Sequence, residues 1–351
     1  MTHASSVTDA NELLALASEP MDALAFIGEL VPPKHFENTT FTNYEPDTEY
    51  PSQRDALDVL INFVAEISHA KKKSKSFITK IFSQKLSGRG LYLDGGFGVG
   101  KTHLLAASYY ACEGNSAFLS FQELMFLVGL QSLTGVFESL RSLDLLIIDE
   151  FELDDPANTR ISTNLLGQLF HSGVSIITSS NTPPGALGEG KFSVEDFERE
   201  LGELTSRFRV VKIDGEDYRS KHLKQSDEQS TWFSEIAELE KFLLLAKSDA
   251  MTIDTNFTDF LHVLSKVHPM RIRRAIGKLD RIILRDVKQI SHPHEALRFV
   301  YFIDKAYDSN LSLIVQSHVA IEKLFHSSYF TGGDTKKFLR TMSRLGEMCF
   351  R

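Results

Sequence analysis

Two kinds of hydrophobic pattern divide this chain. Before residue 88, apolar residues recur at helical spacing in the stretches 10–17 and 53–67, and no strong strand pattern is visible. The stretch 31–52 between them is rich in Pro, Asn and Thr, which predicts irregular chain. We therefore expect residues 1–87 to form a helical and irregular N-terminal region.

From Leu91 onward, short apolar runs alternate repeatedly with helix-like segments. This alternation predicts an α/β fold with a mostly parallel sheet and helices on both of its faces. After Asp214 it weakens, and helix-like segments are mixed with two strand-like runs at 281–287 and 311–317. We expect a core domain at 88–217 and a mixed α/β C-terminal region at 218–351.

Composition and charge exclude few classes of function. The chain has 351 residues and a net charge of −9, which argues against a protein dedicated to duplex DNA. Cys112 and Cys349 are the only cysteines, too few for a disulfide framework or a four-cysteine zinc site. No secretory signal or membrane-spanning run is visible. We expect a cytoplasmic protein that could still contact a membrane peripherally.

The stretch 95–102 matches the phosphate-binding loop pattern Gly-x-x-x-x-Gly-Lys-Thr in full. Glycines let the backbone curl so that successive N–H groups point at one centre. Lys101 would place a positive charge near the β- and γ-phosphates, and the Thr102 hydroxyl can bind Mg²⁺. The sequence therefore predicts ATP and Mg²⁺ as cofactors. The expected nucleotide contacts are Gly95, Gly96, Phe97, Gly98, Val99, Gly100, Lys101, Thr102 and His103.

Polar side chains follow two later apolar runs. Asp149 and Glu150 come directly after the run at 145–148, and Asn181 follows the run at 174–180. Ligands of parallel sheets bind outside the carboxyl ends of the strands, so these side chains should face the phosphate loop. Asp149 would bind the Mg²⁺ shell, and Glu150 would polarise the attacking water. Asn181 either contacts the γ-phosphate or this water, or only begins a turn.

Two arginines lie where a predicted helix gives way to the fifth strand. Arg207 and Arg209 stand in the stretch ELTSRFRVV. An arginine contributed by a neighbouring subunit can stabilise the charge that develops on a transferred phosphoryl group. A surface arginine that interacts with the carboxyl end of its own helix is the alternative explanation.

Read in chain order, the phosphate loop, the two acids, Asn181 and the late arginine resemble an AAA+ ATPase. The segments DEFELDDPANTR, TSSNTPPGALGEG, IDGEDYR, RFVYFIDKAYD and SRLGEM resemble the ZapE family of bacterial cell-division ATPases and their mitochondrial relatives, over residues 36–348. The resemblance implies an ATPase that remodels a protein client, namely the tubulin-like division protein FtsZ or a membrane-associated protein. It also implies a homo-oligomer, with a hexameric ring as the expected arrangement.

The resemblance assigns roles to individual residues. It makes Lys101 and Thr102 nucleotide-binding residues, and it makes Asp149 and Glu150 the metal-binding and catalytic acids. Asn181 matches the residue called sensor 1. The arginine finger would be Arg207, with Arg199 and Arg209 as rivals, and the sensor 2 arginine would be Arg298, with Arg271, Arg273 and Arg274 as alternatives.

Two other classes of function compete with the remodelling ATPase. A helicase-loader-like ATPase that acts on nucleic acid is supported by the lysines in 71–75 and the arginines in 271–274. The net charge and the extent of the resemblance argue against it, so we expect no dedicated nucleic-acid binding. A non-catalytic scaffold is disfavoured because Lys101 and Glu150 are both present.

Overall fold

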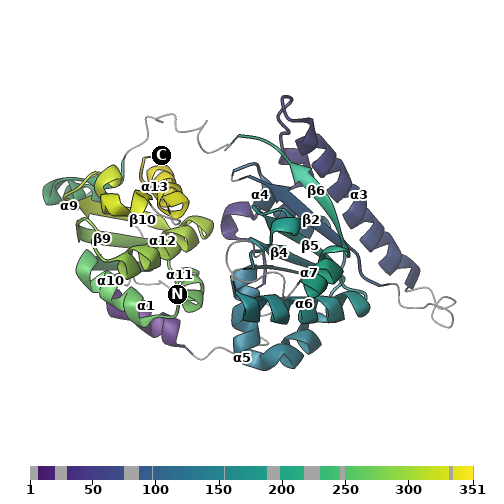
Figure 1. The fold of residues 1–351 in the computed structure, drawn as a ribbon. Coiled ribbons are helices and arrows are strands. Elements are labelled where there is room, and N and C mark those ends of the chain that lie inside the picture. Colours follow the sequence, from purple (N-terminus) through teal and green to yellow (C-terminus); the bar gives the residue numbers. More distant parts are fainter. Residues whose placement is uncertain are drawn as a thin grey trace, which may run out of the picture. The chain divides into compact units, whose positions relative to one another are not determined.

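The computed structural model describes residues 7–19, 30–74, 87–96, 98–153, 155–187, 198–216, 230–245, 250–331 and 335–350. These residues form two compact units, each built on a five-stranded parallel sheet (Figure 1). The core unit consists of Met21–Pro32 and Phe36–Tyr218. The C-terminal unit consists of Met1–Pro20, Pro33–His35 and Arg219–Arg351.

In the core unit, the strands are arranged in the order β3-β4-β5-β2-β6. Every neighbouring pair is parallel, so all carboxyl ends lie at one edge of the sheet. β4 and β5 are buried along their whole length, which explains the continuous apolar run Leu145–Ile148 of β4, whereas β5 is built from two isoleucines and small polar residues. The strands are β2 (Gly90–Gly95), β3 (Ser116–Ser120), β4 (Leu145–Asp149), β5 (Ser175–Ser180) and β6 (Phe208–Ile213).

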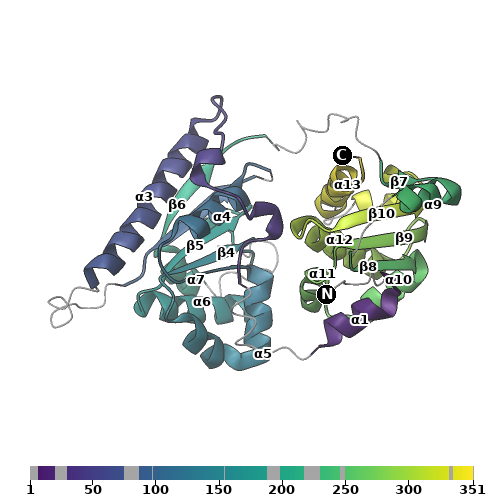
Figure 2. The ribbon, with the colours of Figure 1, turned by 180° about the vertical axis from the view of Figure 1, so that it is seen from behind.

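Helices cover both faces of this sheet (Figures 1 and 2). One face packs against α3 and α4, and the other packs against α5, α6 and α7. Successive strand residues enter opposite cores, as Leu91 and Tyr92 do in β2. The predicted α/β fold is confirmed. The helices are α3 (Pro51–Ser74), α4 (Lys101–Ala111), α5 (Phe121–Leu140), α6 (Pro156–His171) and α7 (Glu198–Thr205).

The C-terminal unit has the strand order β1-β8-β9-β10-β7, again with parallel pairs. Its larger core lies between one face of the sheet and the helices α1 and α10–α13, and a smaller core lies beneath α9. The strands are β1 (Val7–Thr8), β7 (Trp232–Phe233), β8 (Thr252–Asn256), β9 (Arg281–Val287) and β10 (Ser312–Ser317). The helices are α1 (Ala10–Ser18), α9 (Ile236–Leu245), α10 (Phe257–Lys266), α11 (Pro269–Ile276), α12 (Pro293–Asp308) and α13 (Thr335–Cys349).

The mixed α/β character predicted for the C-terminal region is confirmed, although the sheet is larger than the sequence indicated. The two predicted strands are β9 and β10, whereas β8 and the short edge strands β1 and β7 were not predicted. β8 reads Thr-Ile-Asp-Thr-Asn, whose single apolar residue gives little strand signal. Short 3-10 helices occupy Lys34–Phe36, Phe41–Asn43, Pro184–Ala186, Ile321–Lys323 and Ser327–Thr331.

Residues 1–87, predicted as one region, are instead divided between the two units. The apolar face of α1, which includes Leu13, is buried in the larger core of the C-terminal unit, and β1 extends its sheet. Tyr44 and the apolar face of α3 are buried against the core sheet. Each helix belongs to the unit that buries its apolar face. The hydrophobic pattern predicts the helix and its apolar face, but it does not predict which unit will bury that face.

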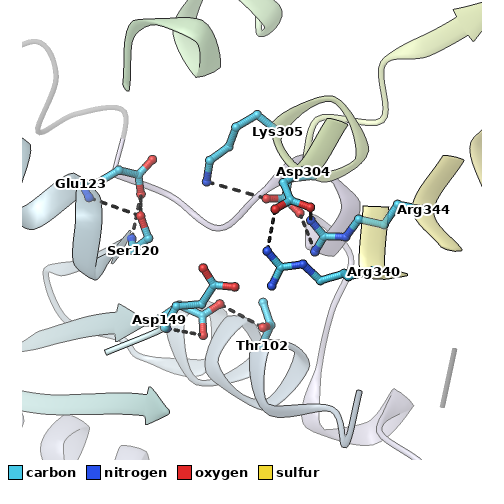
Figure 3. A network of polar contacts seen from close by, with 10 residues as sticks. Thr102, Ser120, Glu123, Asp149, Asp304, Lys305, Arg340 and Arg344 are labelled. Carbon is cyan, nitrogen blue, oxygen red and sulfur yellow. Dashed lines mark hydrogen bonds and ion pairs between the residues drawn. The ribbon is translucent and has the colours of Figure 1, made fainter. Parts of the chain in front are cut away.

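Polar contacts fix two helices in place (Figure 3). In the core unit, α5 begins with a capping box, in which the Ser120 N–H donates to Glu123 Oε2 over 2.7 Å. In the C-terminal unit, Asp304 on α12 accepts hydrogen bonds from Arg340 and Arg344, which lie one turn apart on α13.

No helix within the described residues is both long and apolar enough to cross a membrane.

Candidate functional site

The candidate site lies at the carboxyl edge of the core sheet, where β2 gives way to α4. The connecting loop takes left-handed backbone conformations at Gly98 and Gly100, with φ of 69° and 87°. A Cβ atom on Gly100 would also lie 2.7 Å from Tyr44 Cε2, so both backbone angle and space require glycine there. Phe97, which the sequence placed among the nucleotide contacts, lies outside the described residues.

Lys101 joins the loop to the neighbouring strand. Its Nζ donates to the carbonyl oxygens of Gly95 at 2.8 Å and Gly96 at 2.6 Å, and to Asn181 Oδ1 at 2.9 Å. Asn181 reaches this position because β5 pairs with β2 in a register that places Ser180 opposite Asp94. The structure therefore brings together two residues that are 80 positions apart in the sequence.

The oxygen atoms of Thr102 and Asp149 face each other across a hydrogen bond (Figure 3). The Thr102 hydroxyl donates to Asp149 Oδ2 over 2.9 Å, and Asp149 is buried at the end of β4. A carboxylate and a hydroxyl are ligands of the kind that Mg²⁺ prefers, and Mg²⁺ takes its remaining ligands from water and phosphate. This pair therefore fits a magnesium ion that is bound together with a nucleotide.

Glu150 follows β4 in a left-handed conformation, with φ of 53°. For a residue other than glycine this conformation costs about 1–2 kcal/mol. The Glu150 N–H donates to Asp149 Oδ1 at 3.0 Å and to Ser179 Oγ at 3.1 Å, which offsets part of that cost. The turn directs the chain away from β4 and leaves Glu150 exposed directly after the metal-binding candidate Asp149. Strain held in this way is common at functional sites.

A segment that the sequence predicted only as irregular chain closes one side of the loop. The Tyr44 hydroxyl donates to the Val99 carbonyl over 3.3 Å, and His103 Nε2 lies 3.1 Å from Asn43 Oδ1. Burial raises the pKa of Tyr44 to about 12, so its hydroxyl keeps its proton at neutral pH. Burial lowers the pKa of His103, which favours the neutral ring. The sequence signal that could have indicated an ordered turn in this segment is Thr40, which forms a capping box with Asn43.

Arg207 lies far from the phosphate loop of its own chain. It immediately precedes β6, whose Phe208 pairs with Gly90, so it lies at the amino edge of the sheet. Gly95 lies five residues further along β2, which corresponds to about 17 Å at the usual rise of a strand. The Arg207 guanidinium lies over the Phe170 ring, 5.9 Å from its centroid. The structure therefore does not bring Arg207 to Lys101 within one chain.

The other candidate arginines occupy varied positions. Arg209 is exposed on the edge strand β6, and Arg199 belongs to α7, although its side chain lies outside the described part of the structure. In the C-terminal unit, Arg298 donates to the carbonyl oxygens of Leu264 at 2.7 Å and Val267 at 2.9 Å, where α10 ends. The alternatives to Arg298 as the sensor 2 arginine, namely Arg271, Arg273 and Arg274, all belong to α11.

A cation at the end of a helix satisfies carbonyl groups that have no partner within the helix. Arg298 therefore stabilises the end of α10. Arg271 similarly donates to the Ala17 carbonyl over 3.1 Å, beside the end of α1. These contacts explain both arginines as structural residues of the C-terminal unit. The sensor 2 assignment stays a prediction.

Comparison with known proteins identifies a family whose sequence model matches this chain. A sequence model of the family described as AFG1-like ATPase matches residues 25–256 and 246–350. The match covers nearly all of the core unit and the part of the C-terminal unit after residue 218, and it leaves out the segment that carries β1 and α1.

Individual relatives are distant. The cell division protein ZapE of Escherichia coli K12 is 26% identical over 300 residues, which cover 74% of this chain and 78% of the relative. The lactation elevated protein 1 homolog B of Danio rerio is 23% identical over 222 residues, which cover 55% of this chain and 44% of the relative. A crystal structure of the DnaC helicase loader shares 18% identity and covers 51% of this chain and 99% of its own, with a TM-score of 0.36.

The geometry of Gly100 leads to a first prediction. We expect Gly100→Ala to weaken ATP binding, because the added Cβ meets Tyr44 and the left-handed backbone becomes strained. A strain of about 1–2 kcal/mol corresponds to roughly 10-fold in affinity. Titration with a fluorescent ATP analogue measures the change. Gly167→Ala in α6 is the matched control, because its Cβ meets no atom within 4 Å. Unchanged affinity for Gly100→Ala would contradict the geometry.

Proposed function

Because this chain belongs to the AFG1-like ATPase family, we propose that the site at 95–102 hydrolyses ATP together with Mg²⁺ and that hydrolysis drives the remodelling of a protein client. Family membership makes the chain an ATPase. The observation that best supports the proposed site is the convergence of two contacts at one sheet edge. These are Lys101 with Asn181 at 2.9 Å and Thr102 with Asp149 at 2.9 Å.

In the proposed mechanism, the loop and the start of α4 bind the triphosphate. Backbone N–H groups at a helix start carry a partial positive charge that favours phosphate. Lys101 adds a full positive charge at the same place. Thr102 and Asp149 would hold Mg²⁺, which neutralises charge on the β- and γ-phosphate oxygens when it is bound. Asn181, already in contact with Lys101, would donate its amide N–H to the terminal phosphate or to the attacking water.

Glu150 is the proposed general base. A carboxylate placed directly after the metal-binding acid can accept the proton of the attacking water as that water approaches the γ-phosphorus. The left-handed turn at Glu150 places this residue outside the strand, at the same sheet edge as Lys101 and Thr102. Glu150 is exposed, which leaves its carboxylate accessible to water.

Arg207 is proposed to act on the nucleotide of a neighbouring subunit. Its position at the amino edge of the sheet suits an arginine that stabilises developing charge in trans. This role requires a homo-oligomer, and we propose a ring, with six subunits as the expected number. A cytoplasmic location is part of the same proposal.

The client is proposed from the relatives. One relative is named as a cell division protein, which favours a division protein such as FtsZ, or a membrane-associated protein, as the client of this chain. A helicase-loader-like function is the competing proposal, and the TM-score of 0.36 to the DnaC loader is too low to support it.

The role of Glu150 leads to a second prediction. Glu150→Gln should retain ATP affinity within roughly 2-fold and lose roughly 10²–10⁴-fold in turnover, because the amide cannot accept the water proton. Steady-state phosphate release and equilibrium ATP binding measure the two effects. Lys101→Ala is the matched control and should lose binding itself. Turnover that persists in Glu150→Gln would show that the proposed base is wrong.

The position of Arg207 leads to a third prediction. Pure Arg207→Ala protein should lose roughly 10³-fold in turnover. Mixing it with Lys101→Ala protein should restore part of the activity, because mixed rings contain sites that combine an intact loop with an intact arginine. Arg209→Ala, two residues further along the chain on β6, is the control and should retain activity. If mixing restores nothing, a finger that acts in trans is ruled out.

The proposed client leads to a fourth prediction. Glu150→Gln protein loaded with ATP should retain purified FtsZ in a pull-down, whereas the double variant Lys101→Ala/Glu150→Gln should not. Turnover of the unmodified protein should rise when FtsZ is added. If single-stranded DNA stimulates turnover instead, and the effect fades steeply with added salt, the helicase-loader-like function is favoured.

A further inference from the structure

We propose that Ser179 is a positioning residue that directs the Glu150 carboxylate during ATP hydrolysis. The inference rests on the proposed function, since it concerns the general base of that site. Ser179 lies on β5 and is 1% exposed. No motif in the sequence marks it, because it is one of several small polar residues at the end of β5, two residues before Asn181.

Ser179 contacts three consecutive residues at the end of β4. Its hydroxyl donates to the Asp149 carboxylate and accepts a hydrogen bond from the Glu150 N–H over 3.1 Å. Its carbonyl accepts a hydrogen bond from the Phe151 N–H over 2.7 Å. A single residue of the neighbouring strand therefore holds the whole turn that carries Glu150.

This support matters because the turn is strained. The ladder between β4 and β5 pairs Ile148 with Thr178, and the chain then leaves the strand through Glu150 in its left-handed conformation. A residue with a Cβ adopts that conformation only where its surroundings hold it. The hydroxyl of Ser179 is buried, so water does not compete for its hydrogen bonds.

The two oxygens of Asp149 have different partners. Oδ2 accepts from Thr102, on the side where Mg²⁺ is proposed to bind, and Oδ1 accepts from Ser179 and from the Glu150 N–H. Removal of the Ser179 hydroxyl leaves the Thr102 contact in place and takes away one of the two acceptors of the Glu150 N–H, so the turn loses part of its support on the Glu150 side. Ser179 contacts the oxygen of Asp149 that faces away from Thr102, so the proposal places its main effect on Glu150, and an effect through Asp149 would appear as a changed Mg²⁺ requirement.

A hydroxyl suits this position because it donates one hydrogen bond and accepts another at the same atom. Alanine can do neither. Threonine keeps both functions and adds one methyl group, so it serves as the conservative replacement. Cysteine keeps the shape of serine and weakens both hydrogen bonds.

The test compares turnover with binding. Ser179→Ala should lower kcat roughly 10–100-fold, the effect of displacing a catalytic group by a fraction of an ångström to an ångström. The equilibrium affinity for ATP and the Mg²⁺ concentration for half-maximal activity should not change. Ser179→Thr should restore most of kcat. Ser175→Ala is the matched control, because Ser175 is also buried on β5 but lies at its other end.

A double-variant cycle tests whether Ser179 acts through Glu150. In the Glu150→Gln background, Ser179→Ala should cause no further loss of the residual turnover, because the group it positions is already gone. A full additional loss there, or an unchanged kcat for Ser179→Ala alone, overturns the proposal. So does a large shift in the Mg²⁺ requirement, which would indicate an action through Asp149.

Two further results keep the test decisive. If Ser179→Ala does not fold, Ser179→Cys should show the same selective loss of kcat, and an unchanged kcat would overturn the proposal. Failure of the proposed function has a different signature, because Glu150→Gln would then hydrolyse ATP as fast as the unmodified protein. If Glu150→Gln loses turnover as expected but Ser179→Ala retains full turnover, only the role of Ser179 is overturned.

Discussion

The parallel pairing of β2, β4 and β5 is the constraint on which the candidate site depends. Parallel strands end at one edge of a sheet, so Lys101, Asp149 and Asn181 meet there although they are far apart in the sequence. The position of each residue is set by strand register, and alternate residues of each strand pack into the two cores on either side of the sheet.

Much of the core unit could be predicted from sequence because its signals are local. The phosphate loop, the buried strands and the acids at the end of β4 each occupy a few consecutive residues. The order of the strands was not predicted, and it is the order that places β5 between β2 and β4. The parallel register of β5 with β2 then allows Asn181 to reach Lys101.

Features built from distant residues could not be predicted. Ser179 supports Glu150 from another strand, and nothing in the sequence around Ser179 indicates that contact. Asp304 joins arginines that lie 36 and 40 residues away. The strand β1 has two residues, too few for any periodic pattern, and it exists because β8 offers an edge to pair with.

The division of the N-terminal region between the two units decides how this chain can be cut for study. A fragment that starts at residue 88 would carry the phosphate loop and every strand of the core sheet. It would lack α3 and Tyr44, and the sheet face beneath Leu60 would be open to water. Such a fragment should aggregate when it is expressed alone. A fragment that contains a stable core unit therefore has to begin before Tyr44, well upstream of the phosphate loop.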